Sequence, residues 1–453
     1  MIRLNNETRQ QYIQAIVDSL HDSQIEQFRD VFLEIHPQDQ VDIFNQFDET
    51  LRKRCYEFLS PREFALIFEG LSLKNQLVSF GELDARYFSE VFNNMFTDDV
   101  GYFLKGIDVR KQDEILSQMD EEQAKKIRTL LAYEPETAGS IMTKEFVSIK
   151  ATDQAEYVIE QLREEAPSAE IIYYNYVVNE VGELVGVVSL RDLITAKLDD
   201  VIEDVMLKNV ISVDEQMDQE EVALTIQKYD LLAVPVVSKD ERLLGIVTVD
   251  DVMDILEEET TEDFGELSAV KGATDLDIGS FEAAKKRSPW IVALMFFGLL
   301  TAGVIGQFEE TLEQVVLLAA FVPMIMDSAG NVGTQSLTVS VRGLALGTID
   351  KKNVGKMIRR EFGTGFLMGL ACMIAISLII PLFYGTWMIG FVVGFSILCT
   401  LSVSAAIGAV VPLIINKLNV DPAVASGPFI TTINDIIGLL IYFSIATALL
   451  DVL

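Results

Sequence analysis

The hydrophobic positions change their pattern near residue 290 of this 453-residue chain. Beyond that point long runs carry almost no charge, and a helix needs about 20 such residues to cross the hydrocarbon core of a membrane. One run is long enough for two crossings, with a break at Pro381–Gly385. The pattern predicts an all-α membrane domain of five transmembrane helices in residues 287–453, within the runs Trp290–Gln307, Val315–Val341, Phe362–Asn416 and Pro422–Leu450.

Residues 1–135 instead carry apolar side chains three or four positions apart, as at Ile25, Phe28 and Phe32. This spacing is typical of amphipathic helices. Ser60, Pro61 and the residues after them have the sequence of a helix start with proline at the first helical position. Similar blocks recur, so we expect an acidic, superhelical N-domain of short helices. By itself this indicates only an interaction or regulatory role.

Residues 138–258 contain an internal repeat. Ile141–Ile149 aligns with Val205–Val213, 64 residues later, and each segment is followed by a helix and then by a β-rich run. This arrangement resembles a pair of CBS domains, so we expect α/β units at 138–200 and 203–258. The chain is then a multidomain protein with a helical N-domain, an α/β tandem CBS pair and a polytopic membrane domain.

Both repeats contain the pattern Gly-x-x-Ser/Thr-x-x-Asp, in which a hydroxyl at a strand end is followed by an acid at a helix start. In CBS families such pairs can hold an adenosine ribose, so the resemblance implies a nucleotide site at Ser189, Asp192, Thr248 and Asp251. Plain capping of the following helix explains the same residues, and we favour that interpretation.

Charge is divided as unevenly as hydrophobicity. The chain has 69 acidic and 35 basic residues, a formal net charge of −34, yet only 9 acidic and 7 basic residues follow Trp290. The acidic front part excludes a nucleic-acid binder that relies on bulk charge, and the apolar part excludes a fully soluble protein. Two histidines and three cysteines leave little for zinc. We therefore expect oxygen-ligated metals such as magnesium or calcium.

The basic loop between the second and third spans gives the orientation. It holds Lys351, Lys352, Lys356, Arg359 and Arg360, and such loops lie on the cytoplasmic side. With five spans, the N-terminal domains are expected in the cytoplasm and the C-terminus outside a cell membrane that the chain crosses several times.

Two acids lie inside the predicted spans. Asp435 follows the polar residues Thr431, Thr432 and Asn434, and a carboxylate in lipid is costly unless it faces a pore or water. A protonated packing acid is the alternative. Asp327 begins a polar run that ends at Gln335. This run suits a hydrated ion path or, about equally well, a kinked packing helix.

An acidic run at 257–263 separates the CBS pair from the first span, and we expect a connecting helix at 259–284. Carboxylates crowded near the bilayer surface of a symmetric assembly repel one another unless a cation bridges them. Divalent cations with oxygen ligands do this well.

Over essentially its whole length the chain resembles the MgtE family of magnesium channels and transporters. The specific motifs are Pro323–Gln335 and Gly427–Asp435, with Ala329 where the family usually has a glycine. The resemblance implies a homodimer that is not an enzyme, with Mg2+ as both transported and regulatory ion and ATP as a possible ligand of the CBS pair. It implies pore ligands at Asp435, Asn434, Thr431 and Asn331.

The resemblance also implies gating sites. In the family Asp421 meets the connecting "plug" helix through magnesium. The further gating and sensor residues implied are Glu259, Glu262, Asp263, Asp218, Glu220, Asp230, Asp251, Asp254, Asp98 and Asp99. The implied mechanism closes a pore on the two-fold axis when cytosolic Mg2+ is high, and opens it when unscreened carboxylates repel.

Two alternatives remain open: a nucleotide-sensing membrane receptor without transport, and a less selective transporter of divalent cations such as Co2+ or Mn2+. An intramembrane enzyme is disfavoured, because both histidines, His21 and His36, lie in the N-domain, away from any nucleophile in the spans. No nucleotide-hydrolysing P-loop motif is present.

Overall fold

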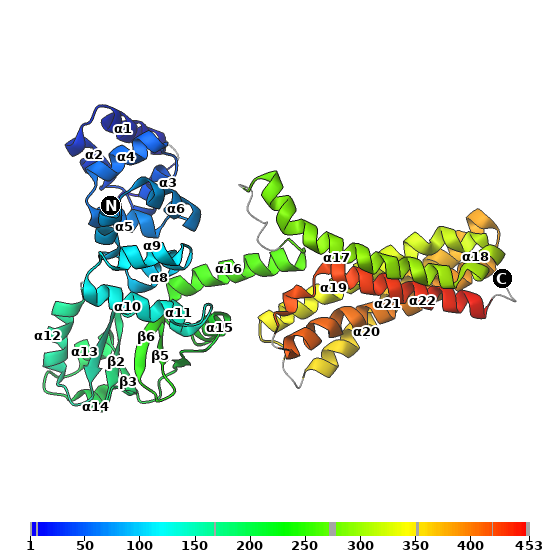
Figure 1. Cartoon of the computed structure of the whole chain (residues 1–453). Helices are drawn as coiled ribbons and strands as arrows, with labels where there is room; N and C mark the ends of the chain where they lie inside the picture. Colours follow the sequence, from blue (N-terminus) through cyan, green and yellow to red (C-terminus); the bar gives the residue numbers. More distant parts are fainter. Residues whose placement is uncertain are drawn as a thin grey trace. The chain divides into compact units, whose positions relative to one another are not determined.

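The computed structural model describes residues 2–5, 8–166, 169–270, 278–349, 353–418 and 420–449. The chain forms two compact units, Met1–Leu256 and Glu257–Leu453, and each is described by itself (Figure 1).

The first unit begins with a helical domain that is built around phenylalanine rings. Phe68 makes edge contacts with Phe88, Phe92 and Phe103, with ring centroids 5.2–5.8 Å apart. The predicted N-terminal helices are confirmed: α1 (Arg9–His21), α2 (Ile25–Phe32), α3 (Pro37–Phe44), α4 (Glu49–Phe58), α5 (Pro61–Glu69), α6 (Leu73–Glu82), α7 (Ala85–Phe92), α8 (Thr97–Lys105), α9 (Val109–Leu116) and α10 (Glu121–Leu131). The helix start predicted at Ser60 is a full capping box with Glu63.

The two repeats form two three-stranded sheets of the same topology. In each sheet the first strand pairs parallel with the second, and the second pairs antiparallel with the third. The segment before β1 also reaches the second sheet, where Thr143 forms an isolated bridge with Ile246 of β6. The elements are α11 (Ala138–Ile141), β1 (Phe146–Lys150), α12 (Ala155–Glu165), β2 (Ile171–Val178), β3 (Leu184–Ser189), α13 (Leu190–Thr195), α14 (Ile202–Val205), β4 (Val213–Asp214), α15 (Gln219–Tyr229), β5 (Ala233–Val237) and β6 (Leu243–Thr248).

The second unit contains five helices that are long and apolar enough to cross a membrane, as predicted. They are α17 (Ser280–Gln307), the 3-10 turn η1 (Val316–Phe321) continued by α19 (Val322–Ala345), α20 (Val354–Tyr384), α21 (Trp387–Lys417) and α22 (Gly427–Ala448). The short helix α18 (Glu309–Gln314) follows the first span. The break at Pro381–Gly385 is confirmed, since Gly385 takes a left-handed conformation after α20. The last span begins five residues later than predicted, because Pro422 starts a separate 3-10 turn, η2 (Pro422–Val424).

The expected connecting helix at 259–284 is divided between two longer elements. Its first part is the end of α16 (Val249–Leu267), a helix that begins directly after β6. Residues 271–277 lie outside the described residues, and Ser280 already belongs to α17. Helical propensity continues through the acidic run, so no boundary at 259 separates it from the CBS domain.

Small residues let the spans approach closely. A β-carbon at Gly365 would lie 2.6 Å from the carbonyl oxygen of Leu401, and one at Gly408 would lie 2.2 Å from that of Gly333. Backbones in membrane bundles commonly meet at such positions. Glu361 of α20 is buried beside α19, where it accepts a hydrogen bond from the Ser336 hydroxyl at 3.0 Å.

Candidate metal centre

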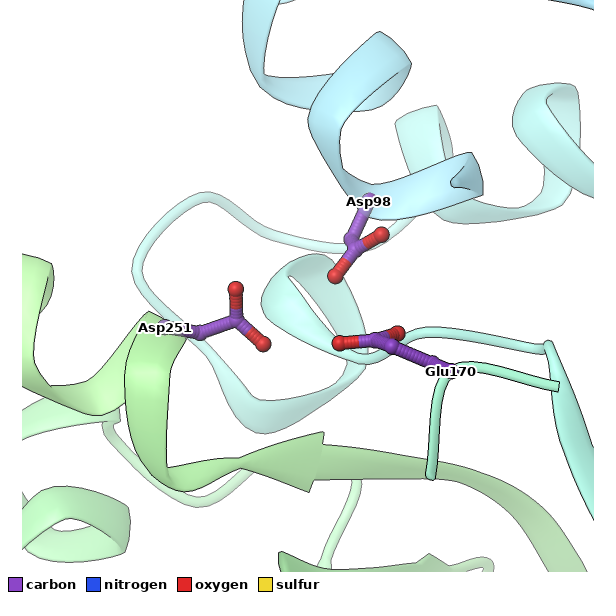
Figure 2. A group of neighbouring side chains, drawn as sticks. All are labelled: Asp98, Glu170 and Asp251. Atoms are coloured by element: carbon purple, nitrogen blue, oxygen red, sulfur yellow. The ribbon is translucent and has the colours of Figure 1, made fainter. Parts of the chain in front are cut away.

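Three carboxylates from distant parts of the first unit converge on one point. Figure 2 shows Asp98 from α8, Glu170 from the loop before β2 and Asp251 from α16 with their oxygens turned toward one another. One oxygen of each lies within 4.8 Å of the other two. Among the described residues, no other group of three metal-binding side chains is this compact.

Local structure explains why two of these acids are where they are. Asp98 lies in the first turn of α8 and Asp251 in the first turn of α16. Acidic residues are favoured there, because the free N–H groups of a helix start carry partial positive charge. Asp251 also accepts a short hydrogen bond from the Thr248 hydroxyl. The Glu170 backbone N–H donates to the carbonyl oxygen of Glu145 at 2.8 Å.

The three acids are poorly compensated. Within the described residues, Oδ1 of Asp98 and Oε2 of Glu170 are buried without a hydrogen-bond partner. Burial, and then repulsion from Asp251 and Glu170, raises the pKa of Asp98 well above its usual range. Burial, and then Asp251, raises the pKa of Glu170 to about 8. Burial raises the pKa of Asp251 to about 6, although the bond from Thr248 opposes the rise.

Further acids extend the negative region. Burial, followed by repulsion from Glu69, raises the pKa of Asp99 to about 8, and Asp251, Asp250 and Asp254 add to the effect. Burial, and then Glu170, raises the pKa of Glu69 to about 7. Acids from the N-domain and from both CBS domains thus repel one another across the junction of these domains.

The donors fit a hard divalent cation. All of them are carboxylate oxygens, which Mg2+ and Ca2+ prefer. Oxygens around octahedral Mg2+ are about 3–4 Å apart, so three oxygens within 4.8 Å need only small side-chain adjustments to share one ion. A cation there would also satisfy the orphaned oxygens of Asp98 and Glu170.

The sequence prediction identified part of this centre. Asp98 and Asp251 lie in it, and Asp99 and Asp254 contribute to its field. Glu170 and Glu69 were missed, because Glu170 lies in a loop without periodicity and Glu69 ends an ordinary amphipathic helix. No sequence signal identifies either residue.

Three other predicted sensor acids, Asp218, Glu220 and Asp230, lie at the ends of α15 and do not belong to this cluster. Asp218 caps α15, where it accepts from the backbone N–H of Glu220 at 2.9 Å, and Asp230 follows the other end of the same helix. At 1.5 Å per residue these two ends are about 18 Å apart. Asp218 and Asp230 therefore cannot ligate one ion within a single chain.

The hydroxyl–carboxylate pairs of the CBS domains are formed. Ser189 caps α13, where its oxygen accepts from the Asp192 N–H at 3.1 Å and its hydroxyl donates to the Asp192 carboxylate at 2.6 Å. This is the capping that we favoured from the sequence. Thr248 makes the corresponding hydroxyl–carboxylate bond to Asp251, so Asp251 belongs to both the acidic cluster and the second pair.

In the second unit, α19 carries a polar face. Asp327, Asn331 and Gln335 recur every four residues and are exposed in the single chain. Thr334, next to this face, lies 3.4 Å oxygen to oxygen from Thr431 of α22. Asp435 lies one turn further along α22, half-buried, with Oδ1 lacking a hydrogen-bond partner among the described residues. Asp327 is close enough to Asp435 for their charges to interact.

Asn434 points elsewhere. Its side chain is fully buried, and its amide nitrogen lies so close to Gly333 that a β-carbon there would be 1.8 Å away. In the described part of the chain neither amide atom has a hydrogen-bond partner. Asn434 therefore packs between helices, while Asp435, Thr431 and Asn331 lie on the more accessible side.

A second acidic group lies at the end of α16, within the second unit. Burial, and then repulsion from Asp421 and Glu262, raises the pKa of Asp263 to about 6, and Arg342 opposes the rise. Asp421 accepts from the Ala423 N–H at 2.8 Å as it starts η2. The two predicted gating acids Asp263 and Asp421 are thus brought together. Glu259 lies one turn earlier on α16.

Comparison with known families gives matches along most of the chain. The divalent cation transporter model MgtE matches residues 322–445, the MgtE intracellular N domain matches 35–136, and the CBS domain matches 138–199 and 202–258. Curated proteins called magnesium transporter MgtE are similar throughout. The protein from Bacillus subtilis (strain 168) is 38% identical over 98% of this chain and 99% of its own length. The one from Enterococcus faecalis (strain ATCC 700802 / V583) is 39% identical over 95% and 96%.

Two solved structures resemble the first unit. The soluble part of a magnesium transporter is 40% identical, with a TM-score of 0.53, and covers 55% of this chain and 99% of its own. The cytosolic domain of the Mg2+ channel MgtE in complex with ATP is 34% identical, with a TM-score of 0.51, over 54% and 99%. On the strength of full-length relatives and three matching domain types, the chain belongs to the MgtE family of divalent cation transporters.

Proposed function

We propose that this protein conducts Mg2+ across a cell membrane. The observation that carries the proposal is the polar face of α19, together with Asp435 of α22, inside helices that are otherwise apolar. Exposed carboxylate and amide groups are costly in lipid, so they are expected to line a water-filled path. Relatives of the same length are magnesium transporters.

Asp435 is proposed as the main pore ligand, with Thr431 and Asn331 beside it. Mg2+ loses its water reluctantly, so these side chains are expected to bind the hydration shell rather than the bare ion. Two copies of the chain around a two-fold axis would bring two Asp435 carboxylates to the same level. Asn434, a pore ligand by resemblance, is proposed to act by holding α22 against α19.

The acidic cluster is proposed to be the sensor. Asp98, Glu170 and Asp251 repel one another, and a bound divalent cation would supply the positive charge that stops this repulsion. The closed arrangement of N-domain and CBS pair then becomes more stable as cytosolic Mg2+ rises. Asp263, Glu262, Glu259 and Asp421 are proposed to take part at the pore mouth. The N-terminal domains would lie in the cytoplasm and the C-terminus outside.

The test of transport is Mg2+ flux into liposomes that contain the purified protein. We expect Asp435→Ala to reduce the flux at least about tenfold. This corresponds to an increase of about 1.4 kcal/mol in the free-energy barrier to conduction. Glu310→Ala, an acid of the short helix α18, is the matched control and should conduct like the wild type. Normal flux through Asp435→Ala would exclude Asp435 as the pore ligand, and no flux through the wild type would favour a receptor. Parallel runs with Co2+ and Mn2+ test the less selective alternative.

ATP is a second candidate ligand, because a related cytosolic domain has been solved in complex with ATP. The Ser189–Asp192 pair has a hydroxyl and a carboxylate 2.6 Å apart, which suits the two hydroxyls of a ribose. Binding of ATP should then weaken in Asp192→Asn. ATP binding without any Mg2+ flux would support the nucleotide-sensing receptor instead.

A further inference from the structure

A cavity of about 500 Å³ opens between the N-domain and the first CBS domain. Its wall contains the basic side chains Arg62, Lys126 and Lys144, in a chain whose formal net charge is −34. The volume is within the range of small-molecule sites. Neither the acidic cluster nor the proposed pore uses these residues.

One of the three cations already has a partner. Lys126 pairs with Glu145 at 3.2 Å. Glu145 also accepts from the hydroxyls of Thr97 at 2.7 Å and Thr143 at 3.1 Å. Its carboxylate is therefore held by Lys126 and by two hydroxyls, and its ion pair among the described residues is with Lys126.

The other two cations have no such ion pair among the described residues. Among the described residues, no carboxylate forms an ion pair with the Lys144 ammonium or the Arg62 guanidinium. Lys144 is half-buried, and burial lowers its pKa. Glu145 raises this pKa again and Lys126 lowers it further. Two positive groups thus face one cavity without forming an ion pair, and an anion that enters would be attracted by both of them.

The rest of the wall suits an organic anion. Phe96 and Phe146 are half-buried and line the cavity, so part of each ring is left to contact a ligand. Asn93 uses its amide oxygen to accept from the Asp120 N–H at 3.1 Å, which leaves its amide nitrogen as a donor. One further acid, Glu165, lies at the wall and accepts from Gln161 at 3.1 Å.

We propose that this cavity binds a small organic phosphate that carries a flat ring. Arg62 and Lys144 bind the phosphoryl oxygens, since a guanidinium and an ammonium together match a dianion. Phe96 and Phe146 contact the ring. The site is separate from the Ser189–Asp192 and Thr248–Asp251 pairs.

The position of the site gives it a consequence for gating. Arg62 belongs to the N-domain and Lys144 to the start of the first CBS domain, so one phosphate holds both domains together. This consequence rests on the proposed Mg2+-dependent closure. The ligand and Mg2+ then favour the same closed arrangement, and each strengthens binding of the other.

The test is calorimetric titration of the full-length protein with phenyl phosphate, which has a phosphoryl group and a ring but no ribose for the CBS pairs. At saturating Mg2+ we expect one saturable site per chain. Lys144→Gln and Arg62→Gln should each weaken binding at least about tenfold, the effect of one lost hydrogen bond between charged groups. Lys150→Gln is the matched control, because Lys150 is an exposed lysine at the end of β1, six residues after Lys144. This variant should bind like the wild type.

Several results would overturn the proposal: no saturable binding to the wild type, unchanged binding in both cavity variants, or an equal loss in Lys150→Gln. Loss in Ser189→Ala alone would place the anion at the CBS pair and would also overturn it. Inorganic phosphate that binds as tightly as phenyl phosphate would remove the role of the rings. Binding that is lost in the cavity variants but is the same with and without Mg2+ would support the site and contradict only the proposed closure.

Discussion

Gly333 is the residue on which the close packing of α19 depends. A side chain there would collide with the Asn434 amide, and the Gly333 carbonyl oxygen itself lies against Gly408 of α21. Three helices thus meet at one position that tolerates no β-carbon. The identity of this residue is set by packing, although it lies within a motif that the sequence indicates for ion conduction.

Gly333→Ala is therefore expected to destabilise the membrane unit by about 1–3 kcal/mol, the usual cost of overpacking. The measurement is the thermal unfolding midpoint of the purified protein in detergent. Gly363→Ala is the matched control, because a β-carbon at Gly363 meets nothing within 4 Å. Equal midpoints for both variants would mean that the three helices are not tightly packed at Gly333.

The same crossing shows what a sequence motif leaves open. Thr431, Asn434 and Asp435 follow one another closely, and the motif predicts them as one group of pore residues. The helix turns by about 100° for each residue, so Asn434 is directed into the interior while Asp435 is not. Which neighbour faces the pore depends on how α22 rotates against α19, and this is a tertiary property.

At the scale of elements, the acidic cluster depends on where helices begin. The strongly periodic helices and the repeated sheets were predictable, because periodicity and the internal repeat identify them directly. Asp98 and Asp251 could be predicted from the sequence, since acidic residues are common at helix starts. Glu170 was not, because only the packing of the loop before β2 brings it to α8 and α16.

The cluster predicts a pH dependence in the absence of divalent cations. The folded state raises the pKa of Glu170 and that of Asp99 to about 8, so it binds protons more tightly than the unfolded chain, whose acids titrate near pH 4. Their contribution to stability is complete below the unfolded pKa and is lost as the pH rises through about 8. In EDTA, the thermal unfolding midpoint of the first unit should decrease as the pH is raised from 5.5 to 8.5. The expected decrease is about 2–4 °C for each kcal/mol of stability that is lost.

Glu170→Gln should flatten this fall, because it removes one of the repelling charges, and saturating Mg2+ should flatten it in the wild type. Glu156→Gln, an exposed acid of α12, should behave like the wild type. A wild-type midpoint that does not change with pH in EDTA would contradict crowding of unpaired carboxylates.

For the whole molecule, the acidic residues are concentrated in the part of the chain that precedes the membrane spans. Nearly all the excess acid precedes Trp290, and the most strongly shifted carboxylates of the first unit lie where the N-domain meets the CBS pair. This distribution was visible from composition, but its convergence on one point required the fold. A cation bound to these carboxylates would therefore act at the junction between the N-domain and the CBS pair.

Limited proteolysis across a Mg2+ titration measures that closure. If the N-domain and CBS pair open and close, Mg2+ at ten times its dissociation constant should slow cleavage between them about tenfold. Asp98→Asn should weaken the protection and Glu156→Gln should retain it. Digestion of residues 1–280 that proceeds at the same rate with and without Mg2+ would refute the sensor, whatever the flux measurement shows.

The polar face of α19 also has a consequence while the chain is being made. Asp327, Asn331 and Gln335 make this span the least hydropathic of the five, and an acid near the middle of a helix opposes release from the translocon into lipid. Its main packing partners, α21 and α22, are synthesised later. We infer that the second span waits beside the translocon until those helices arrive, so a nascent chain that ends after α19 should be retained poorly in the bilayer.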